Sequence, residues 1–189
     1  MLANEMYLDS ADIRKNIVSL AKSLGYTPTS SKSPVANVDI TINGASGSTV
    51  TMNKGTVFTT LVDNVTYQFI NNAEISISPQ DGVYKFSNVD LHEGTLVTHR
   101  YTVDSTDVDQ RFMIPNLNAD TSTLKVVIQN SSTDTSTSNY TLASGLRSLD
   151  DTSKAYFLQE TDTGKFEVYF GDGVLGKKLE DGNIVILEY

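Results

Sequence analysis

The hydrophobic pattern of this chain changes its period near residue 35, and that change constrains the fold more than any other feature. Before it, apolar residues recur every three or four positions, which is the spacing of one face of an α-helix. After it, apolar and polar residues alternate, as in 36–42, 65–69 and 73–77, and alternation is typical of strands with one face in water. The sequence therefore predicts a mainly β protein that begins with one amphipathic helix.

The helix is predicted between Asp9, a suitable N-cap, and Leu24, with Gly25 as its C-terminal stop. A polar connector follows it. A helix with one apolar face packs against another apolar surface. Two arrangements are open: the helix docks on its own domain, or it joins a helical bundle with another chain. In the second case the partner-helix interface is the stripe of Ile13, Ile17, Leu20 and Leu24.

The β-rich part contains many Gly and Asn turn signals, which divide it into short strands. We expect antiparallel sheets, which form either one domain or two small β-rich domains. The segment 131–139 has no apolar side chain and is predicted to be a surface loop or linker. The predicted division is a helix and connector in 1–34, a β-rich domain in 35–115 and a second β-rich region in 116–189.

The last region contains the clearest strand signals, at 156–158, 166–170 and 184–187. The third of these is apolar on both faces, so it is predicted to be a central strand. A central strand at the end of a chain would leave an open edge, and we therefore expect the second β-rich region to be truncated at its C-terminal end. Between the last two strands, a structural turn is predicted at Gly171, Asp172, Gly173 and Gly176, with positive φ at Gly171 or Gly173.

Charge and composition argue against several classes of partner. The chain has 14 basic and 23 acidic side chains, a net charge of −9, which disfavours a nucleic-acid partner. It has no cysteine, and His92 and His99 are too few for a common catalytic zinc site. No apolar run approaches the roughly 20 residues that a membrane-spanning helix needs. We expect neither nucleic acid nor membrane as a partner.

Two groups of polar residues are candidates for a metal site or a catalytic site. Asp104, Asp107 and Asp109 could offer oxygens to Ca²⁺, but they lack the glycine and glutamate that complete the common calcium loop. His92 stands next to Glu93 in a strand-like run, where a histidine is more often exposed or singly hydrogen-bonded than catalytic. A solvated acidic loop and ordinary strand histidines are the simpler interpretations.

The glycine-rich segment 171–176 is followed by Lys177 and Lys178, as in some phosphate-binding loops. Such loops, however, lie between a strand and a helix and end in Gly-Lys-Ser/Thr, whereas here a strand follows. We expect no enzyme activity, no cofactor, no metal and no small-molecule substrate.

Four stretches of the sequence, in order along the chain, are 7–28, 114–124, 156–160 and 170–185. They are similar to the baseplate wedge subunit of large contractile-tailed, myovirus-type bacteriophages. The last of them resembles the recurring Phe-Gly-Asp-Gly segment of baseplate J-like proteins in general. Such subunits are several times longer, so the resemblance is to their N-terminal portion.

The resemblance implies a structural protein of the virion, assembled in the host bacterial cytoplasm. In this family two copies of the subunit combine with another wedge protein, their N-terminal helices join a core bundle, and the wedges form the inner baseplate ring around the hub. The implied partners are a second copy of the chain and other baseplate wedge proteins. The alternative is a carbohydrate-binding or adhesin-type β-domain of a phage tail protein, which would use exposed tyrosines and Asp/Asn-rich loops.

Overall fold

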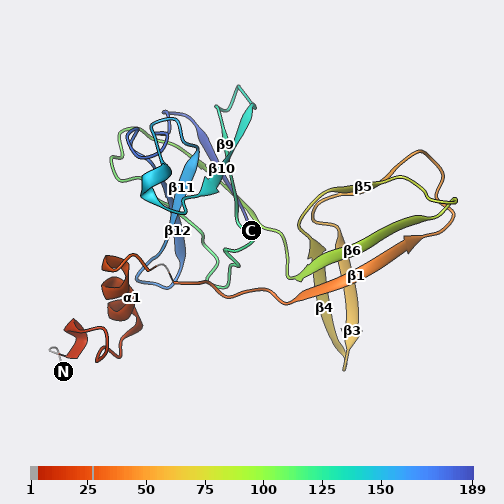
Figure 1. Ribbon diagram of the computed structural model, residues 1–189, viewed down its shortest axis with the longest axis horizontal. Helices are drawn as coiled ribbons and strands as arrows, with labels where there is room; N and C mark the ends of the chain where they lie inside the picture. The colour runs from red at the N-terminus through yellow and green to blue at the C-terminus, as the bar shows by residue number, and fades with distance from the viewer. Residues whose placement is uncertain (1–3, 27) are drawn as a thin grey trace. The chain divides into compact units, whose positions relative to one another are not determined.

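The computed structural model describes residues 4–26 and 28–189, and it confirms a mainly β fold with one short α-helix (Figure 1). The chain forms two compact units. Unit 2 is the continuous segment 32–97, and unit 1 combines the described residues up to Ser31 with 98–189. Unit 2 is thus an insertion in the sequence of unit 1. The boundaries predicted from the sequence, at 34 and 115, differ because 98–115 contributes strands to the sheet of unit 1.

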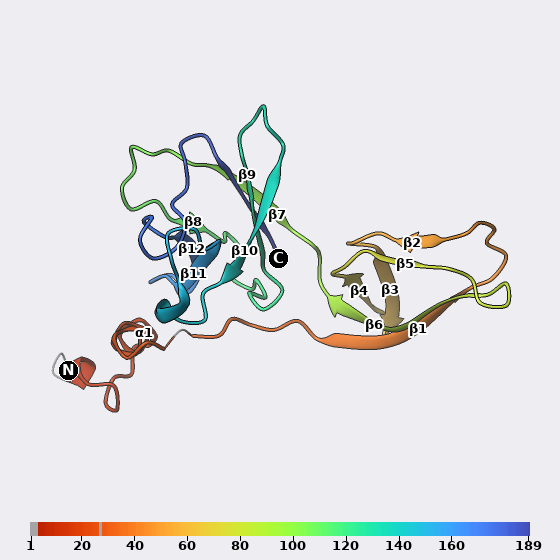
Figure 2. The same cartoon turned by 45° about the horizontal axis from the view of Figure 1, so that its top comes forward.

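Unit 1 contains a seven-stranded sheet in the order β7-β13-β9-β10-β11-β12-β8. Figure 2 labels several of these strands, among them β9, β10, β11 and β12. Neighbouring strands are antiparallel except β10 and β11, which pair in parallel. The strands are β7 (Thr98–Thr102), β8 (Phe112–Met113), β9 (Lys125–Gln129), β10 (Thr137–Leu142), β11 (Ala155–Glu160), β12 (Phe166–Phe170) and β13 (Ile184–Glu188). The helical elements are η1 (Asn4–Met6), α1 (Arg14–Ser23) and η2 (Leu146–Ser148).

The central position predicted for 184–187 is correct, but the open edge expected from it is not present. Strand β13 pairs with β7 on one side and with β9 on the other. Val185 and Leu187 on β13 are fully buried. Both neighbours come from earlier in the chain, at a sequence separation that a local hydrophobic pattern cannot reveal. Because β13 is paired on both sides, an unpaired edge no longer supports the expected truncation, which stays a prediction.

Unit 2 is a four-stranded antiparallel sheet in the order β1-β6-β4-β3, accompanied by a two-stranded sheet of β2 and β5. Its core is the cluster of Met52, Phe86, Val89 and Leu91, and side chains from β2 and β5 pack against it. One face of the larger sheet is thus covered by the smaller. The strands are β1 (Val35–Ile42), β2 (Val50–Met52), β3 (Val57–Val62), β4 (Val65–Asn71), β5 (Ile75–Ile77) and β6 (Tyr84–Glu93).

Two local predictions differ from the structure. Helix α1 begins at Arg14 instead of Asp9, because the Glu5 carboxylate accepts hydrogen bonds from the backbone N–H groups of Asp12 (3.2 Å) and Ile13 (3.3 Å). Glu5 therefore satisfies N–H groups at the start of the helix. Of the two alternatives for 131–139, the surface loop is correct for 131–136, which connects β9 to β10, but the segment ends in strand because β10 begins at Thr137.

Asn71 is the most buried polar side chain of unit 2, and we expect the stability of this unit to be sensitive to substitution there. Its Oδ1 accepts a hydrogen bond from the Thr56 backbone N–H at 2.8 Å, its Nδ2 donates to the Ala73 carbonyl at 2.5 Å, and it is 1% exposed. Replacing Asn71 by Ala leaves both backbone groups without this partner. We expect Asn71→Ala to lower the free energy of unfolding of unit 2 by about 1–3 kcal/mol in urea denaturation.

Asn37→Ala is the matched control, because it removes only an exposed hydrogen bond to Asp90 on the surface of the same sheet. Its expected effect is within about 0.5 kcal/mol. Equal losses in the two variants would contradict a structural role for Asn71.

Candidate assembly interface

Within unit 1, helix α1 is held to the sheet by an ion pair between Arg14 and Glu160, the last residue of β11. The guanidinium donates two hydrogen bonds, Nε to Oε1 at 3.0 Å and Nη2 to Oε2 at 2.9 Å. The Glu160 side chain is 3% exposed, whereas that of Arg14 is 69% exposed. The hydrogen bond and the negative charge of Glu160 raise the pKa of Arg14. Because the two residues are 146 positions apart, nothing in the local sequence indicates this contact.

Only part of the apolar stripe predicted for the helix is buried. Among the residues of α1 whose side chains the structure describes, Val18 and Ala21 are buried, and Ile17 and Leu20 are half-buried. Together with Arg14 they follow the three-to-four-residue spacing of one helix face. The ends of the stripe behave differently: Ile13 is 50% exposed and Leu24 is 74% exposed. The partner-helix role of the stripe stays a prediction, and its exposed ends are the part that is free to meet another chain.

Other exposed apolar side chains accompany these two in the N-terminal segment. Large apolar side chains that gather on a surface often mark sites of protein–protein contact. Here they come from η1, from the turn before α1 and from the residues after it. The additional exposed residues are Met6, Tyr7, Leu8 and Tyr26.

An open groove in unit 1 joins the end of the helix to the Phe-Gly-Asp-Gly turn. Its volume is about 640 Å³. The rings of Phe157 and Tyr169 also line it, stacked with centroids 5.1 Å apart. The structure thus brings two features that are distant in the sequence to one surface. They are Gly25 and Tyr26 from the helix end, and Gly171, Asp172 and Leu175 from the turn.

The turn needs its glycines for two different reasons. Gly173 has φ = 93° and Gly176 has φ = 95°, which confirms the expected positive φ at the second of the two candidate positions. Gly171 has no positive φ, but a Cβ there would overlap the backbone carbonyl oxygens of Leu175 and Gly176. Close backbone approach therefore excludes a side chain at Gly171, and backbone conformation disfavours one at Gly173.

Hydrogen bonds hold the turn in one conformation. Asp172 Oδ1 accepts hydrogen bonds from the backbone N–H groups of Val174 (2.9 Å) and Leu175 (3.1 Å). These bonds lower the pKa of Asp172, with a smaller contribution from the positive charge of Lys178. The turn is therefore a fixed surface feature, and it projects Val174, which is 71% exposed, and Leu175, which is 41% exposed.

A second turn, 150–153, supports the first. The Asp150 carbonyl accepts a hydrogen bond from the Gly176 N–H at 2.9 Å, and the Ser153 carbonyl accepts one from the Lys177 N–H at 2.8 Å. Within this turn, the Asp150 carboxylate accepts a hydrogen bond from the Ser153 hydroxyl at 2.6 Å. That bond and those from Thr152 lower the pKa of Asp150. The two turns together form one hydrogen-bonded platform beside the groove.

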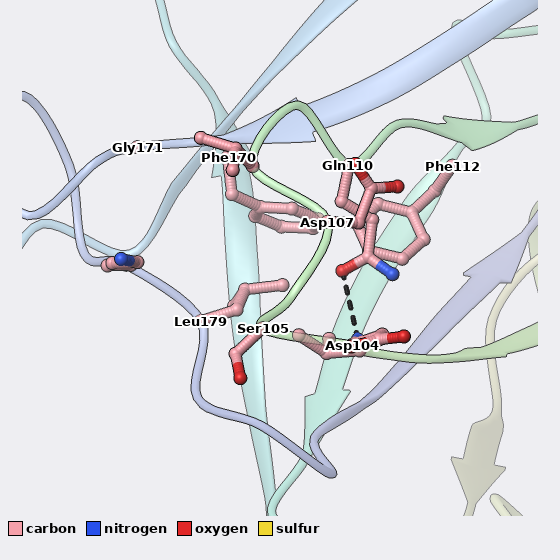
Figure 3. A pocket seen from close by; sticks show the side chains of 11 residues that line it. Asp104, Ser105, Asp107, Gln110, Phe112, Phe170, Gly171 and Leu179 are labelled. Carbon is pink, nitrogen blue, oxygen red and sulfur yellow. Dashed lines mark hydrogen bonds between the residues drawn. The ribbon is translucent and has the colours of Figure 1, made fainter.

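The acidic loop that was considered as a calcium site contributes Asp104 and Asp107 to a smaller pocket of about 230 Å³, which Phe112 and Phe170 also line (Figure 3). Its carboxylates are engaged locally. Asp104 Oδ1 accepts hydrogen bonds from the Thr106 N–H and hydroxyl, and Asp109 pairs with Arg111 at 3.0 Å. Among the residues that the structure describes, no group of three or more His, Asp or Glu side chains has an arrangement that could hold a metal ion.

The two histidines do not form a common site. His92 lies in unit 2, where its Nδ1 is 3.2 Å from the Ser33 hydroxyl. His99 lies in unit 1 and its ring stacks near those of Tyr101 and Tyr189. In the described part of the chain, no helix is both long and apolar enough to cross a membrane.

Comparison with known proteins gives one informative similarity. No family model matches the chain. It is 24% identical over 183 residues to the baseplate wedge protein gp6 of Enterobacteria phage T4, an alignment that covers 94% of this chain and 26% of that protein. The chain thus spans about a quarter of the length of the curated relative that it matches. The similarity supports a relationship to phage baseplate proteins.

The geometry of the turn predicts how strongly alanine substitution at each of three glycines of unit 1 reduces stability. We expect Gly171→Ala to destabilise unit 1 by about 2 kcal/mol or more, because the new methyl group meets backbone atoms that cannot move independently. Gly173→Ala should cost about 1–2 kcal/mol for its positive φ. Gly145→Ala is the control, since open space surrounds that position. Thermal and urea unfolding give the ranking, and a tolerated Gly171→Ala would contradict the close approach.

The acidic turns predict how stability depends on pH. The pKa values of Asp150 and Asp172 are lowered, and that of Asp134, bonded to Asn130 and Ser136, is lowered to about 2. A carboxyl group whose pKa is lower in the folded state stabilises the fold above its unfolded pKa, about 4. That contribution is lost as the pH falls through the folded pKa.

We therefore expect unit 1 to lose stability as the pH falls from about 4 to about 2. Asp172→Asn should be less stable than wild type at neutral pH and should show a shallower loss in acid. Urea unfolding at a series of pH values measures both. An Asp172→Asn profile parallel to that of wild type would contradict the role assigned to this carboxylate.

Proposed function

We propose that the chain is a structural component of a contractile phage tail baseplate, a wedge subunit that contributes to the inner ring around the hub. The observation that carries this proposal is the similarity to a baseplate wedge protein along 94% of the chain. A subunit of this kind acts by protein–protein assembly, with other baseplate wedge proteins and a second copy of the chain as partners. Its place is the virion tail baseplate, and its assembly takes place in the host bacterial cytoplasm.

The exposed N-terminal segment supports this proposal physically. Covering Ile13 and Leu24 in a helical bundle would remove apolar surface from water, at a gain of about 1–2 kcal/mol for each side chain. The bond from Arg14 to Glu160 fixes the face of α1 that meets unit 1. The helix therefore has one face held on its own unit, while both ends of the stripe remain available to partner helices.

The alternative function, a carbohydrate-binding or adhesin-type β-domain, would use exposed tyrosines to bind sugars, and the burial of several tyrosines gives it less support. Sugar-binding platforms need aromatic faces that are open to solvent. Of the nine tyrosines, the buried ones are Tyr84, Tyr140, Tyr156 and Tyr189. Core packing explains these four side chains without a ligand.

The assembly role is tested with the double variant Ile13→Asp/Leu24→Asp. Both side chains are exposed in the isolated chain, so the fold and the melting temperature should be unchanged. A charged stripe should abolish incorporation, measured as co-sedimentation with the other tail proteins of the same phage when they are expressed together.

The matched control is Ser19→Asp/Thr29→Asp, which adds the same two charges at exposed positions away from the stripe. It should assemble like wild type. Normal incorporation of the stripe variant would exclude the predicted partner-helix interface, and failure of wild type to enter any tail particle would exclude the proposed function itself.

A further inference from the structure

Strand β3 is an open edge of the sheet in unit 2, and it lacks the features that usually protect such an edge. Proteins block sheet edges with charged side chains, prolines or bulges. The opposite edge, β1, has a register shift between Val38 and Ile40 and an ion pair from Asp39 to Lys85 at 2.7 Å. Strand β3 contains no charge and no proline, and its register against β4 is continuous. In the described chain β3 has a neighbour on one side only.

The turn between β3 and β4 identifies which backbone groups of β3 are open. Asp63 has φ = 50° and Asn64 has φ = 64°, as in a two-residue type I′ hairpin turn. In such a turn Val62 and Val65 form the closing hydrogen-bonded pair. Hydrogen-bonded and non-hydrogen-bonded pairs alternate along antiparallel strands. The N–H and C=O groups of Val57, Thr59 and Leu61 therefore point away from β4, toward the open edge.

The side chains of these three residues are also uncovered. Val57 is 53% exposed and Leu61 is 65% exposed, and Thr59 between them is exposed as well. They share one face of the strand, because side chains alternate in direction. The edge thus combines open hydrogen-bonding groups with two apolar side chains at fixed spacing.

We propose that β3 pairs with β3 of a second copy of this chain, in antiparallel orientation, with Thr59 opposite Thr59 of the copy. A two-fold axis perpendicular to the sheet relates the copies and keeps each face on its own side. Only this register pairs all three open residues. It sets Val57 opposite Leu61 of the copy, twice, with the threonine pair at the centre. Each of the three pairs exchanges two backbone hydrogen bonds, and the opposed apolar side chains contact each other.

Charge complementarity favours a second copy over other occupants of the edge. Lys54 precedes β3 and Asp63 follows it, and no other charged residue occurs in 54–70. In the proposed register the end of β3 that follows Lys54 lies beside the end of the copy's β3 that precedes Asp63. Opposite charges therefore meet at both ends of the paired strands, although the chain as a whole has a charge of −9 and repels itself elsewhere.

The expected dimer is weak, because one pair of edge strands buries little surface. We expect a dissociation constant of about 10 μM to 1 mM for the free chain. Many copies on one particle would strengthen such a contact through effective concentration. The contact does not involve α1, so it is independent of the helix interface proposed above.

The absence of cysteine allows a direct test with single-cysteine variants of the 189-residue chain. Hydrogen-bonded pairs have Cα atoms about 5.5 Å apart, which is within disulfide range. Thr59→Cys should therefore form a covalent dimer under mild oxidation at high protein concentration. Thr66→Cys, an exposed position on the neighbouring strand of the same hairpin, is the matched control and should remain monomeric.

Sedimentation equilibrium without oxidation gives the second readout. Thr59→Lys places two positive charges at the two-fold axis and should weaken the wild-type dimer about tenfold or more. Thr66→Lys should leave it unchanged, as should Ile13→Asp/Leu24→Asp. A wild-type chain that stays monomeric at millimolar concentration, or equal crosslinking of Thr59→Cys and Thr66→Cys, would overturn the proposal. Circular dichroism establishes that each variant is folded.

Discussion

The architecture of unit 1 depends on the pairing of β13 with strands from two distant parts of the sequence. Residues 184–188 lie between β7, which follows the inserted unit, and β9, which begins at Lys125. Val185 and Leu187 have no exposed surface, so this strand supplies both hydrogen bonds and core. Without it the sheet would separate into β7 alone and the strands from β9 onward. The groove and the platform at the end of α1 are built on those later strands, β11 and β12.

Local patterns in the sequence predicted the elements better than their connections. The alternation in 36–42 and 65–69 and the two-sided run at 184–187 correspond to β1, β4 and β13. Period-two alternation reports burial of one face, which is a local property. The insertion of 32–97 and the parallel pairing of β10 with β11 depend on contacts between distant residues. The start of α1 was missed for a related reason, since Glu5 satisfies the N–H groups that Asp9 was expected to satisfy.

The candidate site shows the same division. A turn at 171–176 could be predicted because clustered glycines mark unusual backbone conformations. That Gly171 is required by close approach, and Gly173 by its φ value, follows only from the folded backbone. The apolar stripe on α1 was visible as a spacing, whereas its buried side is set by Arg14 and Glu160. A buried carboxylate requires a partner, but no signal in the sequence says which cation supplies it.

The insertion of unit 2 also changes the chain entropy of unit 1. The Pro34 carbonyl accepts a hydrogen bond from the Glu93 N–H at 2.9 Å, so the folded insertion has its entry and exit clamped side by side. In unit 1, the Thr121 N–H donates a hydrogen bond to the Ser30 hydroxyl, and these residues are 91 positions apart. Of these positions, 66 (32–97) belong to unit 2, whose two ends already lie together when it is folded. The effective loop is about 25 residues, which reduces its closure cost by about 1 kcal/mol. Unit 2 is also complete before β9 and β13 leave the ribosome, so its early folding shortens the search that assembles unit 1.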